Sequence, residues 1–337
     1  KEFEKKRINE IKYLISIFFL IFIFLLISKT NEDFGYYHLP NSLQFSEQKL
    51  QFGLGNLNHG FKHISSLFQI MSLHYLPFFK FYLFNLTNFL FLIFLLVFVL
   101  EEIFKNFLKN HNISCIFLSL ILIIFLSKFS RLSEYGSDLS GQIIIAIYIF
   151  YIFELLFNQR LKFENKIEYL NISIILIIFA ITLKFILVIY SLLLFLTLFL
   201  IKDKIKICKK LINYKIILLP FSSLAIFVFL NFSSTGCLVY PVEKLCFSDK
   251  FSWAVDSQTI SSLNFHYELW SKGGRGPNFI IDNPKEYLQY FNWFSNWIKV
   301  YFFGKFTDYI LVVFSIIIIF SIFFLKNLFK LNVNHKN

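Results

Sequence analysis

The sequence has little charge: only 16% of its 337 residues are Asp, Glu, Lys or Arg, whereas 57% are hydrophobic. A soluble domain of this length cannot bury so much apolar surface. The apolar residues also occur in long blocks, most of which are long enough to cross a bilayer. The composition therefore excludes an ordinary soluble domain and predicts an all-α, polytopic helical membrane protein.

The sequence also lacks a repeat of fixed period and an inverted repeat of the kind found in many transporters. No small-residue cleavage site follows the first apolar run, which is too long for a typical cleaved signal peptide. We therefore interpret this run as a retained first span. Residue 1 is Lys rather than Met, and we expect residues 1–337 to form a single integral-membrane domain, either a fragment or a minimal form.

About eight apolar runs can be placed as membrane spans. They cover residues 11–28, 82–100, 113–127, 142–157, 170–183, 186–201, 216–231 and 309–325. The fifth and sixth runs are separated only around Lys184, so they form either two spans or one long tilted helix.

Positive charge is distributed unevenly among the connections. The N-terminus, the connections after the second, fourth and sixth spans, and the C-terminal tail are all basic, and KDKIKICKK after the sixth span is the most basic. The positive-inside rule places these parts in the cytoplasm, with both termini. KDKIKICKK then favours two crossings at the fifth and sixth runs. Because orientation accounts for most of the net charge of +12, nucleic-acid binding loses its main support.

This topology leaves three segments outside the membrane: 29–81, 128–141 and 232–308. They contain nearly all the Gly, Pro, His and Trp of the chain, so we expect any chemistry on the outer face. The first segment predicts a helix from Asn41 as N-cap to Gly53, followed by a second helix over FKHISSLFQIMSLHYL. Both are amphipathic and are expected to lie along the bilayer surface.

The third outer segment predicts two more helices. The first begins at Asp256 as N-cap and ends at Gly273. A flexible turn, GGRGPN, then presents Arg275. The second helix begins at Asp282 or Asn283, and its Trp-rich stretch predicts an interfacial helix near residues 284–302.

Four cysteines give little scope for a metal site. Cys115 lies in a predicted span and Cys208 in a predicted cytoplasmic connection, and neither forms a metal-binding pattern with the histidines. Cys237 and Cys246 share an outer segment, where an oxidising exterior permits a disulfide. Their spacing alone leaves a disulfide and two free thiols as open alternatives.

Acidic residues occur in each of the first two outer segments, directly after the first span and within the next outer loop. Glu32 and Asp33 occur in NEDFGYYHLP, and Glu134 and Asp138 occur in EYGSDLSG. This order resembles the GT-C class of integral-membrane glycosyltransferases. YYHLP, EYGSDLSG and TGCLVYPVEKLCFSDKFSWAV also resemble segments of uncharacterised bacterial membrane proteins grouped with that class. The chain differs in having Glu-Asp where the common motif has Asp-Glu or Asp-Asp, and in having fewer spans.

The resemblance implies transfer of a sugar from a polyprenyl-phosphate-linked donor to a surface glycan, lipid or protein. The reaction is expected at the periplasmic face of a bacterial inner membrane, with the donor and membrane lipids as partners. An acceptor hydroxyl needs a base or an orienting carboxylate. Asp33 is the candidate base, and Glu32 is the alternative.

The departing phosphate needs a cation. Arg131 and Arg275 are candidates because Arg binds phosphate through two hydrogen bonds. Lys184, near the outer end of the fifth span, is a third. If a divalent metal ion takes part as cofactor, hard ligands are available: Asp33, Asp138 and His38.

Each candidate also has a purely structural interpretation. Carboxylates at positions 32 and 33 end a helix, and those at 134 and 138 place negative charge at the N-terminus of the fourth span. The cations extend to lipid headgroups or solvent, and His38 is an interfacial polar group. Glu154 lies within the fourth span, where we expect it to reach water at the inner interface.

Two other functions remain alternatives: a transporter or flippase of lipid-linked saccharides, and a polymerase or ligase of surface polysaccharide. A transporter usually has ionisable residues near the bilayer midplane. The predicted spans have apolar centres, which favours an enzyme.

Overall fold

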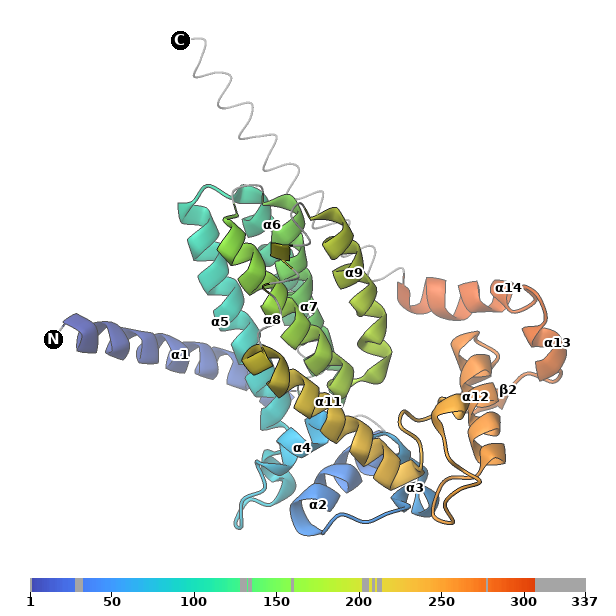
Figure 1. The fold of residues 1–337 in the computed structure, drawn as a ribbon. Helices are drawn as coiled ribbons and strands as arrows, with labels where there is room; N and C mark the ends of the chain where they lie inside the picture. Colours follow the sequence, from blue (N-terminus) through green and yellow to red (C-terminus); the bar gives the residue numbers. More distant parts are fainter. Residues whose placement is uncertain are drawn as a thin grey trace. The chain divides into compact units, whose positions relative to one another are not determined.

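The structure is a computed structural model that describes residues 2–27, 33–127, 132, 135–158, 161–201, 206, 207, 210, 214–276 and 278–306. The chain divides into two units, Lys1–Val255 and Asp256–Asn337. Both units are mainly helical (Figure 1). Each unit is described separately below.

The long helices of the first unit form where the sequence is most apolar. They are α1 (Glu2–Ile27), α5 (Leu86–Leu108), α6 (Asn112–Ser127), α7 (Ser137–Phe157), α8 (Phe163–Leu183), α9 (Ser191–Leu200) and α11 (Tyr214–Thr235). These helices occupy seven of the eight predicted spans, and the eighth lies outside the described residues.

Four helical segments in the described residues are long and apolar enough to cross a membrane. They are Phe81–Leu108, Ser137–Phe157, Phe163–Leu183 and Leu218–Thr235. Apolar helices of this length are what a helical membrane protein requires. The chain is thus a helical protein with membrane-compatible helices, and the count of eight spans stays a prediction.

The fifth and sixth predicted spans are two separate helices. Helix α8 ends at Leu183, and Lys184 has extended backbone angles, φ −152° and ψ 112°. The chain then forms the 3₁₀ helix η5 (Phe185–Tyr190), which leads into α9. Because α9 contacts both α7 and α8, the chain folds back at Lys184, and a single long tilted helix is excluded.

Helix α7 is buried on two faces. One row of its side chains packs in a cluster with α4 (Ser66–Ser72) and α8: Ile144, Tyr148, Ile152 and Leu155. A second row packs in another cluster with α1, α5 and α6: Leu139, Ile143, Ile147 and Phe150. Residues three or four apart lie on the same side of a helix, so these rows are two distinct faces.

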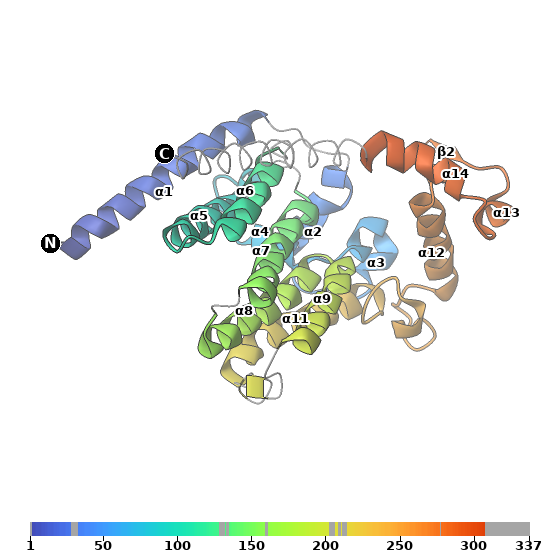
Figure 2. The same ribbon diagram turned by 90° about the horizontal axis from the view of Figure 1, so that it is seen from above.

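Short helices of the first outer segment cover one end of this bundle. They are η1 (Phe34–His38), α2 (Leu39–Glu47), α3 (Leu54–Leu57), η2 (His59–Lys62), α4 and η3 (Phe81–Leu83). Figures 1 and 2 both place α3 beside α11, which it contacts.

The predicted boundaries of the first short helix are wrong. Helix α2 begins at Leu39, so Asn41 lies inside it rather than at its N-cap. The Asn41 Nδ2 instead donates to the carbonyls of Tyr37 (2.7 Å) and Gly60 (3.0 Å). The helix ends at Glu47, and Gly53, with φ +77°, precedes α3.

The second predicted helix of this segment is divided in two. The chain leaves the helical conformation after Lys62 and re-enters it at Ser66. Ser65 caps the new helix, because its Oγ accepts a hydrogen bond from the Leu67 amide (3.1 Å). The same hydroxyl donates to the Leu183 carbonyl at the end of α8 (2.6 Å).

The three segments predicted to lie outside are in contact within the first unit. Ser234 Oγ donates to the Phe61 carbonyl (2.7 Å), and the Gly53 amide donates to the Ser233 carbonyl (2.8 Å). The ring centroids of Phe34 and Tyr135 are 4.2 Å apart, and Asn88 Nδ2, near the start of α5, donates to the Gly136 carbonyl (3.2 Å). The starts of α5 and α7 and the ends of α8 and α11 therefore lie at one end of the bundle, as alternating spans require.

The second unit contains α12 (Ser257–Ser271), strands β1 (Arg275–Gly276) and β2 (Phe279–Ile280), α13 (Pro284–Leu288), α14 (Phe294–Trp297) and the π-helix η7 (Ile298–Phe306). Asp256 caps α12, as predicted, with Oδ1 accepting from the Thr259 amide (2.7 Å). Gly273, with φ +78°, follows the helix end.

Two expectations for this unit are corrected. The turn expected at Arg275 is an antiparallel hairpin, in which Arg275 pairs with Ile280. The Trp-rich helix begins after Asn283 as predicted but stops at Leu288. Tyr290 then has φ +52°, which interrupts the helix before α14.

Candidate functional site

A cavity of about 290 Å³ lies where the three segments meet in the first unit. Its polar lining comes from all three and from the residue after α8, and it includes Tyr37, Lys62, His63, Asp138, Lys184 and Tyr240. Apolar side chains, among them Ile186 of η5 and Phe227 of α11, form the rest of the wall. We refer to it as the charged cavity.

Asp138 and Lys184 form an ion pair in this cavity. Asp138 lies in the first turn of α7, and Lys184 directly follows the last residue of α8. The helix dipole favours an anion at the first position and a cation at the second. Because α7 and α8 pack as antiparallel neighbours, the two favoured charges are brought together.

Asp33 lies beside the cavity and is exposed to solvent. The Tyr37 hydroxyl donates a hydrogen bond to Asp33 Oδ2 (3.4 Å), and Tyr37 itself lines the cavity. The π-helical turn of η1 places these two residues on the same side of the chain. Asp33 is thus one side chain away from the cavity, whereas Glu32 lies outside the described residues.

His38 is buried, with 2% of its surface exposed. Its ring faces Gly136, where a β-carbon would lie 3.0 Å from the imidazole Cε1. Burial lowers the pKa of His38 to about 4, and Lys184 also lowers it, while Asp138 opposes the shift. The imidazole is therefore neutral near pH 7, and its buried Nδ1 has no hydrogen-bond partner among the described residues.

His63 is a second neutral histidine in the cavity wall. Burial lowers the pKa of His63 to about 4, and His59, Lys184, His38 and Lys62 lower it further. The Nε2 atoms of His59 and His63 are 3.3 Å apart. The charged side chains in the described lining are therefore Lys62, Lys184 and Asp138.

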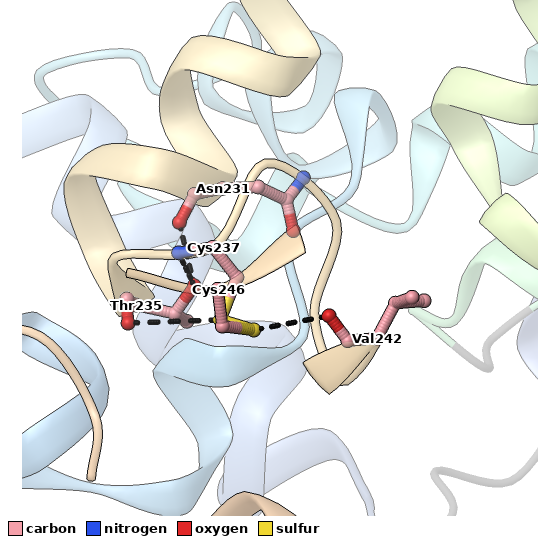
Figure 3. Close-up of a disulfide and its surroundings, with 5 residues drawn as sticks. All are labelled: Asn231, Thr235, Cys237, Val242 and Cys246. Carbon is pink, nitrogen blue, oxygen red and sulfur yellow. Dashed lines mark hydrogen bonds between the residues drawn. A yellow bond between two sulfur atoms is a disulfide. The ribbon is translucent and has the colours of Figure 1, made fainter. Parts of the chain in front are cut away.

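The third segment reaches the cavity through a disulfide loop. Cys237 and Cys246 are joined by a disulfide (Figure 3), and Tyr240 and Pro241 between them line the cavity. Helix η6 (Glu243–Leu245) also belongs to this loop. The Cys237 amide donates to Thr235 Oγ1 (3.2 Å), which ties the loop to the end of α11.

Two of the predicted site residues, Asp138 and Lys184, line the charged cavity. Asp33 and His38 do not line it, but both contact Tyr37, which does. Glu32, Arg131 and Glu134 lie outside the described residues. Arg275 belongs to the second unit, in strand β1.

Sequence reasoning selected only Asp138 and Lys184 among the residues that line the cavity, and it missed several polar ones, among them Tyr37, Lys62, His63 and Tyr240. Two signals were present in the sequence. His59 and His63 are four residues apart, and Tyr240 stands between two cysteines. Neither signal indicates on its own which other segment these residues face.

Across the described part of the chain, no three His, Cys, Asp or Glu side chains are grouped to hold a metal ion. The expectation for Glu154 is wrong, since this side chain is only 2% exposed. Its carboxylate accepts hydrogen bonds from Ser114 in α6 and from Asn158 Nδ2 (2.8 Å).

These observations define a helical protein whose membrane-length helices hold a charged cavity at one end. The chain belongs to a family described as a domain of unknown function, DUF8201, whose model matches residues 1–334. No curated protein and no solved structure matches the chain.

Proposed function

We propose that this protein transfers a sugar from a polyprenyl-phosphate-linked donor at the outer face of a bacterial inner membrane. The observation that carries the proposal is the charged cavity, because side chains from all three predicted outer segments line it at the end of membrane-length helices. In this proposal both termini are cytoplasmic, and the chain crosses the membrane eight times.

The composition of the cavity suits an anionic lipid headgroup. Lys62 and Lys184 supply two positive charges, and Asp138 supplies one negative charge. His63 in the lining and the nearby His38 are neutral near pH 7. Lysine binds phosphate as a point charge. The apolar wall at Ile186 and Phe227 gives the first units of the lipid chain an apolar surface to follow.

Asp33 is the proposed base or orienting group for the acceptor hydroxyl. It is solvent-exposed and accepts a hydrogen bond from Tyr37, which lines the cavity. A carboxylate at the start of a helical turn is held more firmly than one on a loop, and firm placement favours reaction. Lys184 and Lys62 would stabilise the departing phosphate.

The test begins with lipids extracted from cells that lack the protein. Accumulation of one polyprenyl-phosphate-linked sugar is expected and identifies the donor for transfer assays with purified protein. Asp33→Asn should then abolish transfer while expression and membrane insertion remain normal. Glu32→Gln should have a smaller effect.

Asp249→Asn is the matched control, because Asp249 is exposed and does not line the cavity. It should leave transfer unchanged. Unaltered lipids in the deleted cells would contradict the proposal. If a donor accumulates but Asp33→Asn keeps full transfer activity, Asp33 is not the base.

A further inference from the structure

A second cavity, of about 420 Å³, lies on the other side of α11 from the charged cavity. Phe227 and Asn231 of α11 line the charged cavity, whereas Ile226, Phe229 and Leu230 line the second one. Ile64 lines both. The two cavities are therefore neighbours that share a wall.

The second cavity is rich in amide side chains, and we refer to it as the amide cavity. Asn41 and Gln44 use their amide nitrogens for internal hydrogen bonds, to Tyr37, Gly60 and Lys49 carbonyls. Three other amides in its lining have no side-chain hydrogen bond to any described residue: Gln48, Gln51 and Gln69.

Gln69 carries the strongest indication that a ligand is needed. Its Nε2 is buried and has no hydrogen-bond partner among the described residues. A buried donor without an acceptor is costly, and most native structures avoid it. A hydroxyl or ring oxygen in the cavity would supply the acceptor after a small rotation of the amide.

The other residues of the lining limit the chemical class of the ligand further. Phe45, Phe61 and Phe229 present aromatic rings, and Lys49, which is exposed, is the charged residue of the described lining. No carboxylate is part of that lining. Amides that donate and accept, set between apolar rings, match a ligand with several hydroxyl groups and no charge.

We propose that the amide cavity binds an uncharged sugar joined to an apolar chain. The sugar hydroxyls would bond with the three glutamine amides, and the chain would lie against Ile226 and Leu230 of α11. This inference deepens the proposed function, since it assigns a neutral glycoside to a site next to the one for the anionic donor.

The probe is octyl β-glucoside, radiolabelled and used below its micellar concentration, with the protein in lipid nanodiscs. We expect nanodiscs that contain the protein to bind more of the probe than empty nanodiscs do. Octanol and octyl phosphate should compete at least tenfold more weakly than unlabelled octyl β-glucoside. If octanol competes as well as octyl β-glucoside, the cavity binds only the apolar chain, and the inference is overturned.

The variants Gln51→Leu and Gln69→Leu should each raise the Kd for the probe about three- to tenfold, as expected for one lost hydrogen bond between neutral groups. Gln51 is exposed, so its replacement should not disturb folding even if that of Gln69 does. Gln258→Leu, at an exposed position outside the cavity lining, is the matched control and should bind like wild type. Wild-type affinity in the Gln51 variant would overturn the inference.

Binding of a polyprenyl phosphate to the same nanodiscs separates this inference from the proposed function. If Lys62→Gln and Lys184→Gln weaken phosphate binding but no glycoside binds, the inference alone fails. If the glycoside binds but neither lysine variant affects polyprenyl phosphate, the proposed function alone fails.

Discussion

Lys184 pairs with Asp138 across 46 positions of sequence, joining the end of α8 to the start of α7. The two side chains remain 44% and 43% exposed. Water therefore screens their attraction, and such pairs contribute only about 0–1 kcal/mol to stability. The pair fixes two opposite charges in the lining of the charged cavity, and both side chains remain partly exposed.

We predict that the pair matters more for binding than for folding. Lys184→Gln and Asp138→Asn should each change the free energy of unfolding by less than about 1 kcal/mol. Lys184→Gln should weaken binding of polyprenyl phosphate, whereas Asp138→Asn should strengthen it by removing a competing carboxylate. Titration of polyprenyl phosphate into protein in nanodiscs measures the affinity of both variants. Lys244→Gln is the control, because Lys244 is exposed and lies outside the lining. Equal weakening by both variants would contradict this assignment.

Stability should fall as the pH drops from about 6.5 toward 4. The pKa of His38 and of His63 is about 4 in the folded protein, whereas an unperturbed histidine has a pKa of 6.5. In this window the unfolded chain takes up protons that the folded chain does not, so each histidine contributes a loss of at most about 1.4 kcal/mol per pH unit.

Thermal unfolding between pH 4.5 and 7.5 measures how steeply stability changes with pH. His63→Gln should reduce the slope of stability against pH, because the glutamine side chain does not titrate. His111→Gln is the control, since His111 belongs to the cluster around Glu154 instead. An unchanged slope in the His63 variant would refute the prediction.

The disulfide should stabilise the first unit by holding the loop against the cavity. Loss of a cross-link between residues nine positions apart is expected to cost about 2–3 kcal/mol. Cys237→Ala combined with Cys246→Ala should lower the Tm and weaken polyprenyl-phosphate binding, because Tyr240 and Pro241 lose their fixed positions. Cys115→Ser, at a free cysteine, should leave the disulfide intact. A double variant with unchanged Tm and affinity would argue against a structural role.

The Trp-rich part of the second unit should lie at the membrane surface. Tyr290, Phe291 and Phe294 are exposed, and Lys272 lies 5.5 Å from the centre of the Trp293 ring. Exposed rings beside lysines suit the headgroup region. In a variant whose only tryptophan is Trp293, bromine labels near the headgroups should quench fluorescence more than labels at mid-bilayer. The reverse order would indicate a deeper position.

Helix positions were largely predictable from the sequence because apolar runs determine them. Asp256 and Gly273 marked α12 correctly, since capping depends on residues close in sequence. Asn41 is not an N-cap because η1 runs directly into α2, so the chain is already helical before this residue. Its amide nitrogen instead bonds with the Gly60 carbonyl, nineteen positions away, a contact that no local pattern indicates.

The candidate site was predictable in part for the same reason. Asp138 and Lys184 could be chosen because each lies at the end of an apolar run, where neighbouring spans end together. Lys62 and Tyr240 could not, since their place in the cavity depends on long-range packing. The bond from Ser234 to the Phe61 carbonyl spans 173 positions and brings their segments into contact.

Because α7 is buried on two faces, a local loss of packing on one face also affects the other side of the bundle. Each face belongs to a different cluster of apolar side chains, yet both are carried by one continuous backbone. A cavity created beside Tyr148 would loosen the helix that also positions Ile147 for the opposite cluster. The clusters therefore cannot melt independently, and the helices around α7 should lose their structure in one cooperative transition.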